Sequence, residues 1–550
     1  KTDGGQFDGA VTLAGGVSGN TTFNNVVAIV GDLQSSTSGT SNFRAGVNAG
    51  DSIQSGGNYN VFVGDEAGQA ITTGDNNVAV GFEALSTEDT HSRNTAIGHQ
   101  SLKTLNAGAN AQSTAVGYNS AKAVTTGIEN VFIGASAGES ATTPNYTVAV
   151  GKSALGAVLT GDYNTAVGYH AGLATTSGNL NTLVGAFSGD AITTAMTSVG
   201  VGYLTLSAET TGQRSTAMGY SSLANQNITD GSTTDNSAYG FFAGLNVTTG
   251  IQNTLIGSRA GDALTDADKN VAIGYQALSG DTQGNKSVAV GTSALLTQNF
   301  TSSTDSFNTA IGHESMYLSQ TSQYNVALGF QTGYRITTGS QNTLLGYIAG
   351  DHITDGEYNI MIGFAAGTHD RNTNGNRNIL IGAFADANSN TDSDNIVLGY
   401  NVIGQGASNF TFGKDGDDSN IAFGATSISA PSDERYKEEI ETSTAGLSFI
   451  NDLRPVTFKW KKQKDIPSDH RSYVKDSDTR VMGKGEKVQH GFIAQEVKTV
   501  IDNHSEIKDG FNMWSEDNID GRQRLAEGEL IPILVKAIQE LSAEVEKLKG

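Results

Sequence analysis

The chain has 550 residues with no cysteine, 33 basic and 56 acidic residues, and a formal net charge of −23 at pH 7. The absence of cysteine excludes a disulfide framework and a thiolate metal site, and no apolar stretch approaches the roughly 18 residues of a membrane-spanning helix. This acidity argues against a nucleic-acid partner, because phosphate backbones are bound by basic surfaces. We therefore expect neither nucleic-acid binding nor membrane insertion.

The N-terminal segment gives few signals. Lys1 stands where a start methionine would, and no signal-like apolar run follows it. We expect a processed or trimmed fragment that lacks an N-terminal attachment region. Residues 1–41 contain only loose β signals such as Val26–Val30, so an N-terminal β segment is predicted there.

Composition changes abruptly near residue 430. Residues 1–430 hold 61 of the 69 glycines and carry 14 basic and 33 acidic residues, a net charge of −19. Residues 431–550 hold 4 of the 5 prolines and both tryptophans, with a net charge of −4. We predict four segments: an N-terminal β segment (1–41), a repeat shaft (42–413), a linker (414–431) and a C-terminal domain (432–550).

The shaft sequence consists of one short repeat. A unit of the form Asn-x-x-(Val/Ile/Leu)-Gly recurs every 17 residues and lengthens to 19 or 21 residues at four places, as loop insertions between fixed coils would do. The repeat glycines are Gly64, Gly81, Gly98, Gly117, Gly134, Gly151, Gly168, Gly185, Gly202, Gly219, Gly240, Gly257, Gly274, Gly291, Gly312, Gly329, Gly346, Gly363, Gly382 and Gly399. The glycine and β-branched content argues against helices. Each repeat is predicted to be one coil of a mainly β, β-helical or β-roll shaft that rises by about 4.8 Å per coil.

Each repeat strand is apolar on both faces. The residues one and three before the repeat glycine, such as Val78 and Val80, share one face, and the residue between them, such as Leu183 or Leu344, lies on the other. Stacked coils of one chain can cover one face, whereas the second needs another layer. We infer that identical chains supply it around a three-fold axis. Mutating Leu183 and Leu344 to Asp is then expected to abolish the trimer.

The repeat resembles known fibrous proteins. Asn164–Gly172 reads Asn-Thr-Ala-Val-Gly-Tyr-His-Ala-Gly. This phrasing is similar to the coiled head repeats of trimeric adhesins and to shaft repeats of bacteriophage tail fibres. The resemblance covers roughly residues 42–413 and implies a trimeric shaft.

Several short segments, or strings, of the shaft sequence partly match known active-site or metal-binding motifs. Gly134–Gly138 fits a G-x-S-x-G elbow but is in register with the repeat, and Gly151–Ser153 lacks the first glycine of a phosphate loop. Asp415–Asp418 lacks the spacing of a known calcium loop, and the 9 histidines include no His-x-x-x-His pair. We interpret these strings as structural and predict no metal site and no cofactor.

Acidic residues of the shaft are candidates for the two carboxylates of a glycosidase, because stacking brings residues of distant sequence together. The preferred interpretation is that they keep a long rod soluble and free of edge-to-edge association. These candidates are Asp65, Glu66, Glu83, Asp190, Asp262 and Asp351.

Three motifs follow one another in the C-terminal domain: Pro431–Ile440 (Pro-Ser-Asp-Glu-Arg-Tyr-Lys-Glu-Glu-Ile), Gly491–Val497 and Leu530–Leu541. Together they resemble the self-cleaving intramolecular chaperone at the C-terminus of endosialidase-type phage tailspikes and many tail fibres. The resemblance implies a small α+β domain that drives trimerisation.

The same resemblance assigns a self-cleavage site. It implies that Ser432 attacks the carbonyl carbon of Pro431, that Lys437 accepts the serine proton, and that the Pro431–Ser432 bond breaks once. A lysine can serve as the base when desolvation lowers its pKa. The ring of Pro431 restricts the backbone beside the attacked carbonyl, which bears on the rate of cleavage rather than on assembly. The alternative makes Ser432 a helix N-cap, with Arg435 and Lys437 as solvated charges.

The last motif continues into a heptad-like seam. Its apolar residues alternate spacings of four and three, as in a coiled coil that could hold three C-termini together. They are Leu534, Ile538, Leu541, Val545 and Leu548.

These observations favour a homotrimeric phage tail fibre, located in the virion tail outside the cell, whose partners are virion tail proteins and a host-surface glycan or protein receptor. Self-cleavage is the only reaction expected. The longer connections at 225–235 and 298–307 are the candidate receptor-binding loops, because regular coils present nearly the same surface every 17 residues. Two alternatives remain: a bacterial trimeric surface adhesin, and a polysaccharide depolymerase tailspike.

Overall fold

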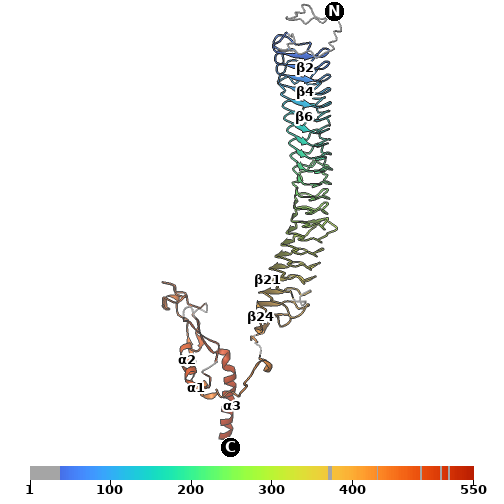
Figure 1. Cartoon of the computed structure of the whole chain (residues 1–550). Coiled ribbons are helices and arrows are strands. Elements are labelled where there is room, and N and C mark those ends of the chain that lie inside the picture. The colour runs from blue at the N-terminus through green and yellow to red at the C-terminus, as the bar shows by residue number, and fades with distance from the viewer. Residues whose placement is uncertain are drawn as a thin grey trace, which may run out of the picture. The chain divides into compact units, whose positions relative to one another are not determined.

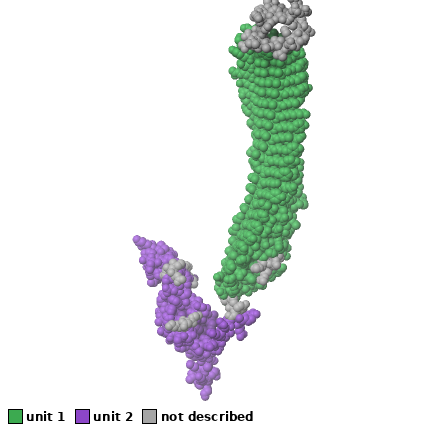
Figure 2. Space-filling model, viewed as in Figure 1, with its two compact units in different colours: residues 1–431 green, residues 432–550 purple. Residues whose placement is uncertain are grey.

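The computed structural model describes residues 38–368, 374–425, 427–429, 432–482, 486–507, 511–517 and 521–550. Two compact units make up the chain, residues 1–431 and 432–550 (Figure 2). The expected β signals at Val26–Val30 lie outside the described residues. The predicted mainly β architecture is confirmed.

Unit 1 is a β-solenoid, whose coils stack into a long, gently curved column (Figure 1). Within the described part of the unit, its main sheet has 23 strands. They are β1 (Phe43–Ala45), β2 (Val61–Val63), β3 (Val78–Val80), β4 (Thr95–Ile97), β5 (Thr114–Val116), β6 (Val131–Ile133), β7 (Val148–Val150), β8 (Thr165–Val167), β9 (Thr182–Val184), β10 (Val199–Val201), β11 (Thr216–Met218), β12 (Ser237–Tyr239), β13 (Thr254–Ile256), β14 (Val271–Ile273), β16 (Val288–Val290), β18 (Thr309–Ile311), β19 (Val326–Leu328), β20 (Thr343–Leu345), β21 (Ile360–Ile362), β22 (Ile379–Ile381), β23 (Ile396–Tyr400), β24 (Asn409–Lys414) and β25 (Asp417–Ala422). A small second sheet pairs β15 (Gly284–Asn285) with β17 (Thr304–Asp305).

Each short strand pairs in parallel with the equivalent strand of the next coil, as Val148 does with Thr165 and Ala149 with Ala166. From β2 to β22 the middle residue of each three-residue strand points into the coil and is buried, whereas its two neighbours point outward; in β1 the middle residue, Arg44, is exposed. Leu183 and Leu344 are middle residues with exposed fractions of 1% and 0%. They therefore belong to the core of a single chain, and their choice as probes of a contact between chains was wrong.

The core is filled by complementary volumes within each coil. Where the middle strand residue is large, as Phe132 is, the residue four after the repeat glycine is glycine, here Gly138; a Cβ there would lie 2.3 Å from the Phe132 ring. In many coils whose middle residue is small, as Ala149 is, the equivalent position holds a buried leucine, here Leu155. In the coil of Ala166 that position is Gly172, and the space beside it is filled by Leu155 and Leu183 of the neighbouring coils. This exchange explains why the repeat alternates between Ala-Gly and Ala-Leu, since interiors are close-packed.

The repeat glycine is fixed by conformation and by stacking. Gly168 has φ +143°, and a Cβ on it would lie 2.4 Å from the carbonyl oxygen of Gly185 in the next coil. Any other residue would strain the backbone and separate the coils.

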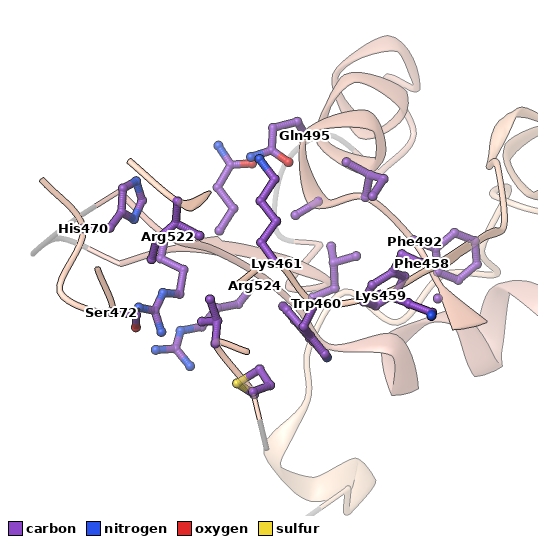
Figure 3. Close-up of a pocket in the computed structure, with 18 of the residues that line it drawn as sticks. Phe458, Lys459, Trp460, Lys461, His470, Ser472, Phe492, Gln495, Arg522 and Arg524 are labelled. Atoms are coloured by element: carbon purple, nitrogen blue, oxygen red, sulfur yellow. The ribbon is translucent and has the colours of Figure 1, made fainter. Parts of the chain in front are cut away.

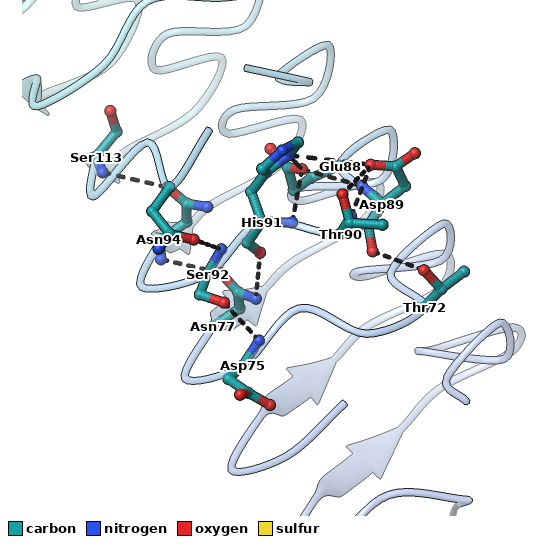
Figure 4. A network of polar contacts seen from close by, with 11 residues as sticks. Thr72, Asp75, Asn77, Glu88, Asp89, Thr90, His91, Ser92, Asn94 and Ser113 are labelled. Atoms are coloured by element: carbon teal, nitrogen blue, oxygen red, sulfur yellow. Dashed lines mark hydrogen bonds and ion pairs between the residues drawn. The ribbon is translucent and has the colours of Figure 1, made fainter. Parts of the chain in front are cut away.

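The repeat asparagines form a hydrogen-bonded ladder inside the column. The backbone N–H of Asn77 donates to Asn60 Oδ1 at 2.8 Å, and Asn60 Nδ2 donates to the carbonyl of Gly74 at 2.8 Å. Figure 4 shows the ladder continuing from Asn77 to Asn94 and Ser113. The amides of Asn60 and Asn77 are thus satisfied between coils, which fixes the register of stacking, whereas Asn94 Nδ2 has no partner among the described residues.

The column ends in a hairpin. Strands β24 and β25 are antiparallel, and Asp415 and Gly416 form the turn between Lys414 and Asp417. Asp415 has φ +52°, which suits a two-residue Asp-Gly hairpin turn. Asp415–Asp418 is therefore this turn and the first two residues of β25, in keeping with its structural interpretation, and the hairpin covers the edge of the last parallel strand.

Unit 2 is a small α+β unit. Its elements are η1 (Glu434–Tyr436), α1 (Leu447–Asp452), β26 (Val456–Phe458), η2 (Gln463–Asp465), β27 (Gln489–Gly491), α2 (Ala494–Asn503), β28 (Trp514–Glu516), β29 (Gln523–Leu525), η3 (Glu527–Glu529) and α3 (Leu530–Lys549). Strands β26 and β27 are antiparallel, as are β28 and β29. The core joins α1, α2 and the start of α3 through Ala445, Phe449, Leu453, Val497, Ile501, Met513, Leu530 and Ile533.

Candidate functional site

Ser432 and Lys437 meet at the start of unit 2. The Lys437 Nζ donates a hydrogen bond to Ser432 Oγ at 2.7 Å, across the single turn of η1 that separates them. This is the distance at which an amine can take a proton from a hydroxyl. Pro431, the predicted residue on the other side of the bond to be cut, lies outside the described residues.

The turn that brings the pair together is capped by Asp433, not by Ser432. The Asp433 carboxylate accepts from the backbone N–H of Arg435 at 2.9 Å and pairs with the Arg435 guanidinium. These hydrogen bonds hold the pKa of Asp433 below its ordinary value. The alternative in which Ser432 caps the helix is therefore wrong, and the Ser432 hydroxyl is left for Lys437.

Both members of the pair are exposed to solvent in the single chain. A lysine acts as a base only in its neutral form, which desolvation favours. The chain by itself thus supplies the geometry of a Ser–Lys dyad without the burial that would activate it.

Helix α3 has two distinct faces. Leu530, Ile533 and Ala537 are buried, and α3 packs against α1. The predicted seam lies on the other face and is uncovered: Ile538 is 66% exposed and Leu548 is 87% exposed. An apolar face of this kind on a helix that is already anchored is a surface for other helices.

The outward face of the solenoid sheet is also apolar and uncovered. The last residue of most strands is a large apolar side chain, and Ile97, Leu328 and Leu345 are 39%, 43% and 41% exposed. This column of side chains runs with the strands from β4 to β22. The prediction that each strand is apolar on both faces is confirmed, with the outer face formed by the residues that flank the middle one.

Exposed aromatic side chains stack in a column at the position that follows the repeat glycine. Phe330 and Tyr347 stack with ring centroids 5.2 Å apart, and Tyr347 and Phe364 stack at 5.0 Å. Tyr347 is 47% exposed. Stacks of this geometry stabilise neighbouring coils and widen the apolar surface.

A pocket of about 760 Å³ lies in unit 2. Figure 3 shows Arg522, Ser472 and His470 gathered at one end of it and the rings of Phe458 and Phe492 at the other. Arg522 Nη2 donates to Ser472 Oγ at 2.8 Å. Sequence reasoning did not find this pocket, because its lining comes from four separate stretches of the chain.

A buried histidine ties two helices together in unit 2. His504 Nε2 lies 2.9 Å from Asp452 Oδ2 at the end of α1, and His504 Nδ1 lies 2.9 Å from Glu506 Oε1. The hydrogen bonds to Glu506 and Asp452 raise the pKa of His504 above its ordinary value.

The strings that imitate active sites are ordinary corners of the solenoid. Ser136 and Ser153 both have positive φ, of 57° and 54°, and take the same corner as His170. The backbone N–H of each bonds to the preceding coil. Their structural interpretation is thereby confirmed.

The candidate glycosidase acids are not assembled into an active site. Glu66 and Glu83 take the same corner of adjacent coils, but a hydrogen bond from Lys103 at 2.6 Å lowers the pKa of Glu83, which disfavours its use as a general acid. Asp190 and Asp262 lie four coils apart, roughly 19 Å at 4.8 Å per coil, too far for a carboxylate pair. Burial raises the pKa of Asp190, Asp262 and Asp351.

One acidic cluster was missed because its residues imitate no known motif. Ligand atoms of Glu88, Asp89 and His91 lie within 4.8 Å of one another, and His91 Nδ1 is 2.6 Å from Glu88 Oε1 (Figure 4). Glu88 is fully buried, and no donor among the described residues reaches its Oε2. The other carboxylate oxygen of Glu88, Oε1, is hydrogen-bonded to His91.

Comparisons with known proteins bear on unit 2. Residues 432–506 match the family described as chaperone of endosialidase, and the match begins at Ser432, the first residue of the unit. This match and the long β-solenoid fit a tail fibre or tailspike with a C-terminal chaperone, which confirms the resemblance read from the motifs. No curated protein and no solved structure is significantly similar to the chain. None of the described helices is long and apolar enough to cross a bilayer.

Proposed function

We propose that this protein is the homotrimeric shaft of a phage tail fibre that attaches the virion to a host surface, and that unit 2 assembles three chains before cutting itself free. The observation that carries the proposal is the hydrogen bond between Lys437 and Ser432 at the first residue of the chaperone match. Virion tail proteins and a host-surface glycan or protein receptor are the partners.

The reaction is one turnover on the chain itself. Lys437 Nζ accepts the Ser432 hydroxyl proton as Oγ bonds to the carbonyl carbon of Pro431. The bond from that carbon to the Ser432 nitrogen breaks, the nitrogen takes up a proton, and an ester remains. Water hydrolyses the ester, which leaves a shaft ending at Pro431 and a fragment that starts at Ser432. Burial of Lys437 between assembled chains would favour its neutral form and so link cleavage to assembly.

Two uncovered apolar surfaces support the trimer. One is the seam of α3, and the other is the outward face of the solenoid strands with its aromatic column. Soluble single chains rarely leave contiguous apolar surface of this extent in water. Three copies cover both surfaces at once, and a seam that holds three C-termini raises the local concentration of the shafts.

The test of self-cleavage is denaturing electrophoresis of the full chain after expression. Wild type should give a fragment of 119 residues and a shaft that ends at Pro431, whereas Ser432→Ala should stay full length and still assemble. Lys437→Arg should also stay intact, because a guanidinium keeps the charge but does not act as a base.

Glu438→Gln is the matched control, since it removes an exposed charge next to Lys437 without touching the hydrogen bonds of Asp433, Arg435 or the dyad. It should cleave as wild type does. A wild-type chain that remains a single full-length band after prolonged incubation would contradict self-cleavage and leave a purely structural assembly domain.

A further inference from the structure

Two coils of the solenoid carry a long loop that is held in the same way. The coils that end at Gly240 and Gly312 have 21 residues each, and 72 residues separate them, which is four coils. Each carries a loop, residues 225–235 (loop A) and 298–307 (loop B). Each loop also pairs with the preceding coil: Thr233 bridges Gln213, and β17 pairs with β15 at the equivalent place.

Loop A is anchored by a buried carboxylate. Glu209, in the preceding coil, is fully buried and accepts hydrogen bonds from the backbone N–H of Gly212 at 2.6 Å and from Gln226 Nε2 at 2.8 Å. Gln226 Nε2 also donates to Ser215 Oγ at 2.8 Å, and its Oε1 accepts from Asn236 Nδ2 at 2.8 Å. Both oxygens of Glu209 and the whole Gln226 amide are thus satisfied.

Loop B repeats this network residue for residue. Asp281 is fully buried and accepts from the backbone N–H of Gly284 at 3.0 Å and from Gln298 Nε2 at 2.6 Å. Gln298 Nε2 donates to Ser287 Oγ at 2.8 Å, and its Oε1 accepts from Asn308 Nδ2 at 2.9 Å. Every one of these residues lies 72 positions after its counterpart.

Such networks are not needed to build a coil. At the same position, seven residues after the repeat glycine, many other coils place buried apolar residues such as Ile71 and Leu264. Glu88 is a third buried carboxylate at this position, but the next coil offers it Leu105 in place of a glutamine. A buried carboxylate is costly unless every acceptor is satisfied, so the two networks hold their loops in single conformations. A loop that is held in advance loses little entropy when it binds.

The exposed tips show what the loops can bind. Loop A presents Thr229, Asp230 and Ser232, and loop B presents Thr301, Ser302 and Ser303, all of them exposed hydroxyl or carboxylate groups. Such groups suit the hydroxyls of a sugar. The net charge of −19 over residues 1–430 repels anionic polymers. Four coils at about 4.8 Å place equivalent tips roughly 19 Å apart along the shaft.

We propose that loops A and B form a bivalent site for a neutral, linear polysaccharide that lies along the shaft. The inference rests on the proposed attachment function and adds the ligand class and the residues. Two equal sites at a fixed distance on a rigid column match a ligand whose own structure repeats. The tips of both loops lie outside the strands of the main sheet, so chains that cover the outer face of that sheet leave the tips open.

The test uses the assembled Ser432→Ala protein and an array of neutral and acidic bacterial polysaccharides. Wild-type loops should bind neutral linear polymers. Size-fractionated fragments of the best binder are then titrated in solution. Fragments long enough to span about 19 Å should bind on the order of 10²-fold more tightly than shorter ones.

Alanine at the three tip residues of either loop should remove this length threshold, and alanine in both should abolish binding. Thr125→Ala with Thr126→Ala, in an ordinary coil, is the matched control and should bind as wild type does, with all variants melting alike. Binding that persists without both tips, that shows no length threshold or that prefers acidic polymers overturns the inference. An array with no loop-dependent binder overturns it too; if the fibre still attaches to host cells, the attachment function stands without it.

Discussion

Among single residues, the proposed self-cleavage depends on a few side chains whose surroundings decide what they do. The Ser432 hydroxyl is free for Lys437 because Asp433 takes the capping role beside it. The Ser-x-x-x-x-Lys spacing was visible in the sequence, since one helical turn brings its ends together. The capping residue was not, because Ser and Asp are both good N-caps and stand next to each other.

His504 makes unit 2 sensitive to pH. Its pKa is raised in the folded chain by hydrogen bonds to Glu506 and Asp452, so its contribution to stability is complete below the ordinary histidine pKa and is lost as pH rises through the folded pKa. His504→Gln should therefore lower the melting temperature of unit 2 more at pH 5.5 than at pH 9. Tryptophan fluorescence measures this unit selectively, because both tryptophans lie within it.

The lowered pKa of Glu506 acts in the opposite sense, since its contribution is lost only as pH falls below the ordinary carboxylate range. Measurements above pH 5 separate the two effects. An equal loss of stability at pH 5.5 and pH 9 would show that His504 acts by packing on Phe449 rather than by charge.

At the level of the single coil, two pairings of core residues recur: a large middle strand residue with glycine, as in Phe132 and Gly138, and a small one with leucine, as in Ala149 and Leu155. Phe132→Ala should destabilise the shaft by about 3–5 kcal/mol, because it leaves a cavity beside Gly138. Adding Gly138→Leu should recover a large part of that loss, since Ala with Leu is the pairing of the next coil at Ala149 and Leu155. Thermal unfolding of the two single variants and the double variant measures the coupling.

Gly138→Leu alone is the control, and it should be strongly destabilising, because the Phe132 ring occupies the space. A double variant that is no more stable than Phe132→Ala would show that the two positions are independent.

Helix α3 offers a second element to test. Ile538→Glu with Leu541→Glu places charges in the exposed seam and should shift the protein from trimer to smaller species without unfolding unit 2, because neither side chain is in its core. Gln539→Glu, exposed on the same helix, is the matched control. Sedimentation velocity measures the size of the assembled species. A double variant that assembles as wild type does would show that the α3 seam does not hold the chains together.

The coil period was predictable because one glycine per coil is demanded by both conformation and stacking, as at Gly168. Which face of each strand points into the core was not predictable. Val78, Ala79 and Val80 are all apolar, so the alternation of apolar and polar residues that normally marks the inner face is missing. The networks at Glu209 and Asp281 were also invisible, because their partners are 17 residues away and no motif links them.

For the whole molecule, the chain joins two structurally different units. The solenoid is held by contacts between neighbouring coils and exposes an apolar face and two anchored loops. Unit 2 carries a dyad, a seam and a compact core of its own. A shaft that has lost its chaperone has no template left, so a cleaved fibre is expected to be protected by slow unfolding rather than by ready refolding.

The central claim is that three chains form one particle, and the mass of the uncleaved Ser432→Ala protein by sedimentation equilibrium tests it most directly. We expect about three times the chain mass of 57.1 kDa, unchanged on dilution through the micromolar range. A folded, soluble particle of 57.1 kDa, with its outer strand faces and α3 seam open to water, would contradict it.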